Sequence, residues 1–343
     1  MRILFVHPNN DFTGSTKVLS DVIKEYYYND SVKVLTMSDS EGFLSNDDHI
    51  KIIRITYPRY KDRDIFILSS LLSLLDRVDK CLRELNKSDI IYINTIKPYY
   101  AAILAKLCGK KIVWHIHEKY TSRSLSQKIF EFVQSHTDAH FVFVSRYVRE
   151  QYIISSKSTF EIRYNKLSKS FLKDIKIRPI KERSRTNLLM ASGLTKAKGI
   201  YNFVDLARHL PDYNFHLVLS CTEKEKNDFI NSVNPSSNCV IWSRQKSMHQ
   251  SYYKADVIMN MSIPALSIET FGMTILEGMA YGLPAIVPNI GGPLEILHNG
   301  VEGYAIDVCD FNDLKEAILG ITSDESTYEN FSEAALKRSY EFR

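Results

Sequence analysis

Cysteine is scarce in this sequence and scattered along it. The chain of 343 residues has five cysteines, an odd number, and no two of them form a Cys-x-x-Cys pair. Disulfide-rich and zinc-stabilised domains place their cysteines in even or closely spaced sets. The pattern therefore excludes a disulfide framework and a zinc knuckle, and a reducing compartment fits it best. The five are Cys81, Cys108, Cys221, Cys239 and Cys309.

Long hydrophobic runs are also absent. The longest uncharged apolar stretch, residues 65–75, is well short of the roughly 20 residues that cross a bilayer. The apolar run at the start of the chain ends at His7, which is too early for a signal peptide. No HExxH motif, low-complexity segment or short repeat is present. We expect a cytoplasmic protein without a membrane-spanning helix, a metal or another cofactor.

Charge is nearly balanced over the whole chain but not along it. The net charge is +4, while residues 1–170 hold 26 Lys and Arg against 19 Asp and Glu, an excess of +7. We expect the first half to face an anionic partner. A content of 44% hydrophobic and 24% charged residues is typical of globular proteins, and 343 residues favour two domains.

Short apolar runs alternate with segments of helical period, which indicates βα units around parallel sheets. We predict two Rossmann-like, doubly wound α/β domains, residues 1–165 and 188–327, that face a central cleft. The stretch 166–187 lacks an apolar period and is predicted as a linker, and a helix over 328–343 is expected to pack back on the first domain. Strands are predicted at 3–6, 32–35, 50–55, 90–93, 112–117, 141–144, 188–191, 215–219, 240–242, 257–261, 285–287 and 304–306. Helices are predicted at 15–28, 64–85, 98–107, 124–135, 200–210, 223–233, 274–281, 293–297 and 312–318.

The most informative segment is SIETFGMTILEGMAYGLPAIVPNIGGPLEIL, residues 267–297. It contains the ordered pattern E-x-F-G-x-x-x-x-E, G-x-P and GG-x-x-E. This pattern resembles the donor-binding segment of glycosyltransferase family 4, whose members have the GT-B fold of two Rossmann-like domains. The residues that carry the resemblance are Glu269, Phe271, Gly272, Glu277, Gly282, Pro284, Gly291, Gly292 and Glu295.

A physical reading of this segment points to a nucleotide sugar. If Gly272 opens a helix, the N–H groups of Gly272, Met273 and Thr274 are unpaired and suit a diphosphate. Eight residues separate Glu269 from Glu277, which spans up to roughly 12 Å along a helix. The resemblance implies that Glu277 binds the ribose hydroxyls and that Glu269 binds hydroxyls of the sugar. The alternative is that both are solvent-facing helix carboxylates.

A second motif, GLTKAKG, follows a predicted strand at residues 193–199. Family members usually read G-R-L-x-x-x-K-G, so Lys198 matches the lysine that neutralises the leaving diphosphate. Gly193 stands where the family has an arginine, and Lys196 is a partial substitute at best, because an ammonium cannot copy a guanidinium fork. A solvated lysine in an ordinary loop is the alternative for Lys198.

Candidate residues in the first domain follow its predicted strands. Gly14 and Ser15 match the family's glycine-containing loop, although a structural turn explains Gly14 equally well. His115 and His117 alternate along one strand and share a face, and the resemblance places a histidine such as His117 near the donor sugar, with His115 second. Asn94 and Ser145 end two further strands, where either a ligand contact or a helix cap explains them.

The resemblance implies a retaining, metal-independent glycosyltransferase that moves a sugar from a nucleotide diphosphate to a sugar or lipid-linked acceptor. Polysaccharide or glycolipid assembly is the expected setting. No nucleic acid partner is expected. The amphipathic segment 64–85 is predicted as a buried helix, with peripheral contact with the inner membrane surface as the alternative. Other functions left open are a nucleotide-sugar epimerase of the same fold and a non-catalytic nucleotide-sugar-binding protein.

Overall fold

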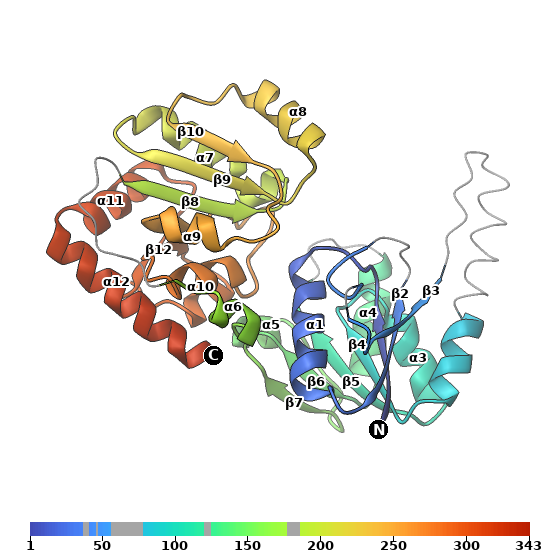
Figure 1. Cartoon of the computed structure of the whole chain (residues 1–343). Coiled ribbons are helices and arrows are strands. Elements are labelled where there is room, and N and C mark those ends of the chain that lie inside the picture. The colour runs from blue at the N-terminus through green and yellow to red at the C-terminus, as the bar shows by residue number, and fades with distance from the viewer. Residues whose placement is uncertain (37–40, 46, 56–77, 120–124, 177–185) are drawn as a thin grey trace. The chain divides into compact units, whose positions relative to one another are not determined.

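The chain folds into two compact units, Met1–Arg163 and Tyr164–Arg343, each built on one parallel sheet (Figure 1). The structure is a computed structural model, and it describes residues 1–36, 41–45, 47–55, 78–119, 125–176 and 186–343. Each unit is described by itself below.

The sheet of unit 1 has seven described strands in the order β3-β2-β1-β4-β5-β6-β7, and every described pairing is parallel. The chain starts at β1 and extends the sheet first on one side, to β2, and later on the other, to β4. The winding of the sheet therefore reverses between the neighbouring strands β1 and β4. The strands are β1 (Arg2–His7), β2 (Ser31–Thr36), β3 (Lys51–Arg54), β4 (Ile90–Asn94), β5 (Lys111–Ile116), β6 (His140–Phe143) and β7 (Thr159–Ile162).

Helices connect these strands and bury their apolar sides on the sheet. Helix α1 packs Val18, Leu19, Val22 and Ile23 with the inner residues of β1 and β2 to form one core cluster. The described helices of unit 1 are α1 (Gly14–Tyr26), a helix over residues 78–86, α3 (Tyr99–Leu107), α4 (Leu125–Ser135) and α5 (Arg146–Glu150).

The sheet of unit 2 repeats the same winding with six strands in the order β10-β9-β8-β11-β12-β13. Here β8 is the first strand, and the reversal falls between β8 and β11, which pair in parallel from Leu188 with Val257. The strands are β8 (Asn187–Ser192), β9 (Asn214–Leu219), β10 (Cys239–Trp242), β11 (Val257–Met259), β12 (Ala285–Pro288) and β13 (Gly303–Ile306).

Polar caps set the starts of several helices in unit 2. Thr222 and Glu225 form a reciprocal capping box at α8, and the carboxylates of Asp310 and Asp324 accept N–H groups at the starts of α11 and α12. The helices of this unit are α6 (Lys169–Lys173), α7 (Ile200–His209), α8 (Glu223–Val233), α9 (His249–Lys254), α10 (Met273–Met279), α11 (Phe311–Thr322) and α12 (Glu325–Ser339), with the 3₁₀ turns η1 (Lys196–Lys198), η2 (Gly292–Glu295) and η3 (Tyr340–Phe342).

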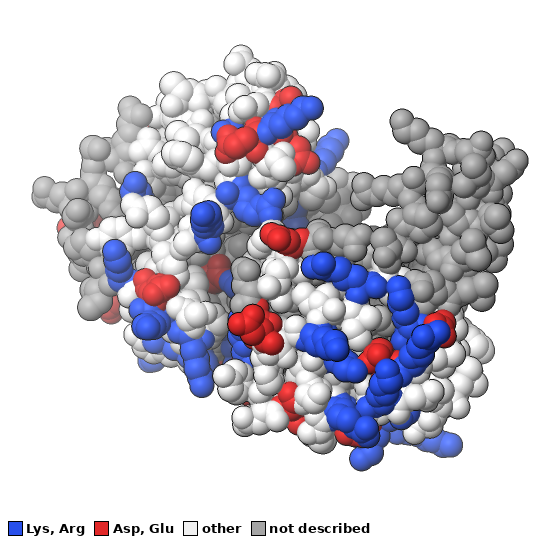
Figure 2. Space-filling model, turned by 45° about the vertical axis from the view of Figure 1, so that its right-hand side comes forward, with Lys and Arg blue, Asp and Glu red and all other residues white. Residues whose placement is uncertain are grey.

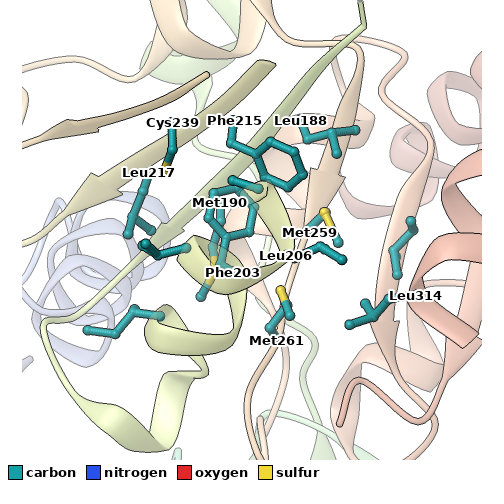
Figure 3. Close-up of a cluster of buried hydrophobic side chains, with 14 of the residues drawn as sticks. Leu188, Met190, Phe203, Leu206, Phe215, Leu217, Cys239, Met259, Met261 and Leu314 are labelled. Atoms are coloured by element: carbon teal, nitrogen blue, oxygen red, sulfur yellow. The ribbon is translucent and has the colours of Figure 1, made fainter. Parts of the chain in front are cut away.

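The core of unit 2 is apolar and closely packed (Figure 3). Leu188 and Met190 from β8 and Phe215 and Leu217 from β9 lie in one cluster with Phe203 and Leu206 of α7. The rings of Phe203 and Phe215 meet edge to face with centroids 5.2 Å apart. The strands that the sequence predicts as fully apolar are thus buried on this face.

The α/β fold with two Rossmann-like units is as the sequence predicts. Within the predicted linker 166–187, residues Lys169–Lys173 form α6, and the unit boundary falls at residue 163. The C-terminal helix begins at Glu325, earlier than predicted, and contacts α10 and α11 of its own unit. Its expected packing on the first domain stays a prediction. Of the helix predicted at 64–85, residues 64–77 lie outside the described part of the chain.

Charged side chains of both signs lie on the face shown in Figure 2, and Lys and Arg gather in one region of it. Among the described residues, no helix is long and apolar enough to cross a bilayer. The peripheral membrane contact suggested for segment 64–85 stays a prediction, because most of that segment is outside the described residues.

The core of unit 2 generates a first prediction. Phe203→Ala removes a fully buried ring and should lower the free energy of unfolding by about 3–5 kcal/mol. The matched control is Phe311→Ala in the same unit, where the ring is 37% exposed. Urea unfolding followed by circular dichroism measures both, and equal losses for the two variants would contradict the packing described here.

Candidate functional site

The most polar group of sequence-predicted residues in unit 2 lies where its sheet reverses. Lys198 ends the 3₁₀ turn that follows β8, and Glu269 lies in the loop that follows β11. Open parallel sheets bind ligands outside the carboxyl ends of the two strands at such a reversal. The fold therefore brings together two residues that are 71 positions apart in the sequence.

Lys198 and Glu269 form an ion pair. The Nζ atom of Lys198 lies 2.7 Å from Oε2 of Glu269, and Nδ2 of Asn260 donates to the same oxygen at 3.3 Å. Burial opposes the charge on Glu269, but Lys198, Asn260 and the N–H of Phe271 outweigh it and hold the pKa of this carboxyl below its usual range. Glu269 is therefore an ionised hydrogen-bond acceptor at neutral pH.

The loop after Glu269 leads directly into α10. Phe271 is buried and lies near the rings of Tyr164 and Phe342, with centroids 6.1 and 6.0 Å away. Gly272 is the N-cap of α10 and has φ +107°, a backbone conformation that favours glycine. Met273 and Thr274 are partly exposed and form the first two positions of the helix, where N–H groups have no partner within the helix.

Gly291 and Gly292 pack directly against the backbone of this loop. A Cβ atom at Gly291 would lie 2.4 Å from the carbonyl oxygen of Glu269, and one at Gly292 would lie 2.0 Å from that of Thr270. The N–H of Gly292 also donates to the carbonyl of Glu269 at 2.9 Å. The two glycines thus allow direct backbone contact that fixes the position of Glu269. Both glycines therefore contact the backbone of the predicted donor-binding loop. Their predicted contact with the nucleotide sugar stays a prediction.

Glu277 lies inside α10 with 5% of its surface exposed, so it is not the solvent-facing helix carboxylate of the alternative reading. Its Oε2 atom accepts a hydrogen bond of 2.7 Å from the hydroxyl of Tyr252, which is fully buried on α9. Burial and the neighbouring carboxylate raise the pKa of Tyr252 well above its usual value. Tyr252 is not predictable as a site residue from the sequence, because helix α9 has no sustained apolar period.

Glu295 lies in the 3₁₀ turn η2 and contacts the chain around it. Its Oε2 atom accepts a hydrogen bond of 2.9 Å from the hydroxyl of Tyr164, and its carbonyl accepts one of 2.8 Å from Arg338. The latter links η2 to α12. These contacts describe a residue that fixes the turn after the two glycines.

Gly193 and Lys196 lie in the loop between β8 and α7. A Cβ atom at Gly193 would meet no heavy atom within 4 Å, so neither crowding nor a left-handed backbone requires glycine there. Lys196 is exposed, and no contact in the described residues assigns it the role of the arginine that the resemblance leads one to expect at 193.

In unit 1, sequence-predicted residues gather at the reversal between β1 and β4. Nδ2 of Asn94, the last residue of β4, lies 2.9 Å from Nδ1 of His7, the last residue of β1, and 3.3 Å from the carbonyl oxygen of Ser15. Oδ1 of Asn94 lies 2.8 Å from Nε2 of His117, which follows β5. Gly14 begins helix α1 beside them. Asn94 therefore makes side-chain contacts and caps no helix.

His115 and Ser145 are buried, and both form hydrogen bonds with neighbouring residues of unit 1. The ring of His115 is buried, its Nδ1 lies 3.0 Å from the hydroxyl of Tyr92, and its Nε2 has no partner among the described residues. Ser145 is fully buried and its hydroxyl accepts the N–H of Val148 at 3.1 Å, which caps α5. The cap reading of Ser145 is thus the one the structure supports, since its oxygen already serves the helix.

Two further polar residues of unit 1, His7 and Glu118, were not predicted from the sequence as site residues. His7 ends the first apolar run, which was predicted only as a strand. Glu118 follows His117, and burial raises the pKa of its carboxyl to about 7. Its Oε1 accepts the N–H of Ile96 at 3.3 Å, while Oε2 has no partner in the described residues. A polar residue directly after an apolar strand was the signal that could have found both.

A separate pocket in unit 2 has a volume of about 620 Å³ and is lined by residues of α7, α8 and α11, including Tyr201, Asp205, Arg208 and Phe311. None of the sequence-predicted site residues lines it. We place the candidate site at Lys198 and Glu269, because these two residues form an ion pair where the sheet reverses. Within the described residues, no cluster of three or more His, Cys, Asp or Glu could hold a metal ion.

Comparison with known proteins gives similarities in fold and in sequence. The structure of HepE from Anabaena, solved in complex with UDP and glucose, superposes with a TM-score of 0.78 at 19% identity and covers 100% of this chain and 95% of its own. An uncharacterized glycosyltransferase of Methanocaldococcus jannaschii is 26% identical over 261 residues, 73% of this chain and 71% of its own length. A sucrose synthase of Melioribacter roseus is 44% identical over 79 residues.

The sucrose synthase match spans 22% of this chain and 10% of that protein. Residues 173–338 match the family described as glycosyl transferases group 1. This segment makes up most of unit 2 and is similar to that family. The chain as a whole has the two Rossmann-like units of the GT-B fold, as predicted from its sequence. The finer assignment to glycosyltransferase family 4 stays a prediction.

The glycine pair generates a second prediction. Gly292→Ala places a methyl group against the carbonyl of Thr270 and should lower the free energy of unfolding by about 1–3 kcal/mol through overpacking. Gly193→Ala, where a Cβ meets open space, is the matched control and should have almost no effect. Urea unfolding measures both, and an unchanged midpoint for Gly292→Ala would show that the loop has room to move.

The ion pair generates a third prediction. Because the pKa of Glu269 is lowered in the folded state, its charge adds stability that is fully present above the unfolded glutamate pKa of about 4.3 and is lost as the pH falls through the folded pKa. Glu269→Gln should therefore be less stable than wild type at pH 7, and the difference should shrink below about pH 4. Unfolding curves across this pH range measure it, and a difference that grows on acidification would reverse the assignment.

Proposed function

We propose that the protein is a retaining glycosyltransferase that moves a sugar from a nucleotide diphosphate sugar to a hydroxyl acceptor without a metal ion. The observation that carries the proposal is the Lys198–Glu269 pair, at 2.7 Å, where the sheet of a glycosyl transferases group 1 domain reverses. A cation and an ionised carboxylate at such a point suit a ligand that carries both phosphates and hydroxyls.

Donor binding assigns a role to each residue of the loop. The ammonium of Lys198 would exchange its contact with Glu269 for the diphosphate, and Glu269, ionised in the folded protein, would accept hydrogens from hydroxyls of the sugar. Glu277, held by Tyr252 at 2.7 Å, would accept hydrogens of the ribose. N–H groups at Gly272, Met273 and Thr274 would add hydrogen bonds to the phosphates. The structure of HepE that holds UDP and glucose supports a donor of this class.

The chemistry we propose is electrostatic. The bond between the sugar and the phosphate breaks first, the departing diphosphate takes the proton of the acceptor hydroxyl, and the new bond forms on the same face of the sugar. Lys198 would stabilise the charge that develops on the leaving group, and a preorganised contact of this kind is typically worth a few kcal/mol. Because the pair keeps Glu269 ionised, its role is to orient hydroxyls. His117, as the resemblance implies, would contact a hydroxyl of the donor sugar.

The setting we propose is the cytoplasmic face of a membrane, where a sugar or lipid-linked acceptor is extended during polysaccharide or glycolipid assembly. The excess of Lys and Arg over Asp and Glu in residues 1–170, 26 against 19, supports an anionic acceptor or surface.

A screen of nucleotide diphosphate sugars by thermal shift should identify a donor that raises the melting temperature. For that donor, Lys198→Ala should weaken binding about 10- to 100-fold, because a charged hydrogen bond contributes roughly 1.5–3 kcal/mol. Glu277→Ala should weaken it to a similar degree. Lys196→Ala, which removes an exposed lysine two residues away, is the matched control and should bind as wild type does.

Binding that survives both changes undiminished would overturn the site. If a donor binds but product analysis finds an altered nucleotide sugar and no transfer, the protein is an epimerase. A donor that binds without transfer or slow release of free sugar identifies a binding protein, which Gly193 at the position of the family's arginine would favour. Activity that disappears with EDTA and returns with a divalent cation would overturn metal independence.

A further inference from the structure

A chain of five polar side chains crosses the buried end of the sheet in unit 1. The hydroxyl of Thr16 lies 2.7 Å from Oδ1 of Asp11, and Nε2 of His7 lies 3.0 Å from the Thr16 oxygen. Nδ1 of His7 lies 2.9 Å from Nδ2 of Asn94, whose Oδ1 lies 2.8 Å from Nε2 of His117. Four of the five are buried, and none of these contacts is predictable from sequence spacing.

The orientation of the Asn94 amide is fixed by its backbone neighbour. One of its two terminal atoms lies 3.3 Å from the carbonyl oxygen of Ser15, which can only accept a hydrogen bond. That atom must therefore be the nitrogen. Thr95, the next residue, has φ +75° and is held by its N–H to the carbonyl of His115 at 2.8 Å, which fixes the backbone directly after Asn94.

The donor-to-acceptor direction of all the hydrogen bonds between these five side chains follows from two acceptors. At one end, the carboxylate of Asp11 takes the hydrogen of the Thr16 hydroxyl, so the Thr16 oxygen accepts from Nε2–H of His7. In the middle, the amide nitrogen of Asn94 donates to Nδ1 of His7, which agrees with that tautomer. The amide oxygen is then left to accept from Nε2–H of His117. Both ends of the chain give the same direction.

We propose that Asn94, supported by His7, Thr16 and Asp11, is a positioning residue that holds His117 as the neutral Nε2–H tautomer and leaves Nδ1 of His117 as a hydrogen-bond acceptor. Resting on the proposed function, this identifies the group that His117 contacts. A lone pair on Nδ1 accepts a hydrogen from a sugar hydroxyl and repels a carboxylate. The inferred donors therefore carry a neutral hydroxyl at that position of the sugar.

The surrounding groups keep both rings neutral. Burial lowers the pKa of His7 to about 4 and that of His117 to about 3, and His7 lowers the latter further. Lys97 also disfavours a proton on His7, while Asp11 favours one. Two further titratable neighbours are His115, whose ring centroid lies 4.1 Å from that of His117 and whose pKa is also lowered by burial, and Glu118, the next residue, whose pKa burial raises to about 7.

Long-range ¹⁵N–¹H spectra of histidine-labelled full-length protein test the inference, because they distinguish the two neutral tautomers and the charged ring. We expect His7 and His117 as Nε2–H tautomers that stay neutral from pH 8 down to about pH 5, since their pKa values are about 4 and about 3. An Nδ1–H tautomer at His117, or its protonation near the ordinary value of about 6.5, would overturn it.

Asn94→Asp probes the chain directly. A carboxylate at this position cannot donate to His7, and its negative charge favours a second proton on either ring, so both His7 and His117 should titrate at higher pH than in wild type. Asn86→Asp, the same change at an exposed position of unit 1, should leave both titrations unchanged. Unchanged titrations in Asn94→Asp would refute the coupling.

If Asn94→Asp does not fold, the wild-type spectra decide alone. None of these measurements uses a nucleotide sugar. A failed donor screen therefore counts against the proposed function only, and a wrong tautomer counts against this inference only.

Discussion

Both units depend on one constraint, which is that a doubly wound parallel sheet reverses its winding between two neighbouring strands. The loops that leave these strands diverge to opposite faces, so the carboxyl ends between them are not covered by a crossover. In unit 1 this place brings His7 within 2.9 Å of Asn94, and in unit 2 it brings Lys198 within 2.7 Å of Glu269. Polar groups that lie far apart in the sequence meet there because the topology brings the carboxyl ends of the two strands together.

The two meeting points differ in their chemistry. The residues of unit 2 are ionised, partly exposed and held by a short salt bridge, whereas those of unit 1 are neutral, buried and connected by directed hydrogen bonds. A charged pair suits contact with charged groups, and a neutral array with a fixed direction suits recognition of hydroxyls. The two sheets therefore offer different chemistry at the places where they reverse.

The fold was predictable because buried parallel strands are almost continuously apolar and the intervening helices have a clear period. Strand β7 was missed because its residues are largely exposed and show no apolar run, and α9 because six residues are too few for a period. Site residues carried by a motif, such as Lys198 and Glu269, were found. Tyr252 and His7 were not, since hydrogen bonds between residues 25 and 87 positions apart leave no mark on local sequence. Ser145 was predicted as a candidate site residue but caps α5. A helix cap and a ligand contact give the same local sequence pattern, so the sequence could not distinguish them.

The open space around Gly193 affects which residues this position can hold. A side chain at a glycine that touches a neighbouring backbone, such as Gly292, would force that backbone to move. Position 193 is under no such demand, since a Cβ there would meet nothing within 4 Å. The fold would therefore accept a larger residue at 193, and the arginine that the resemblance leads one to expect could be introduced there without displacing the backbone.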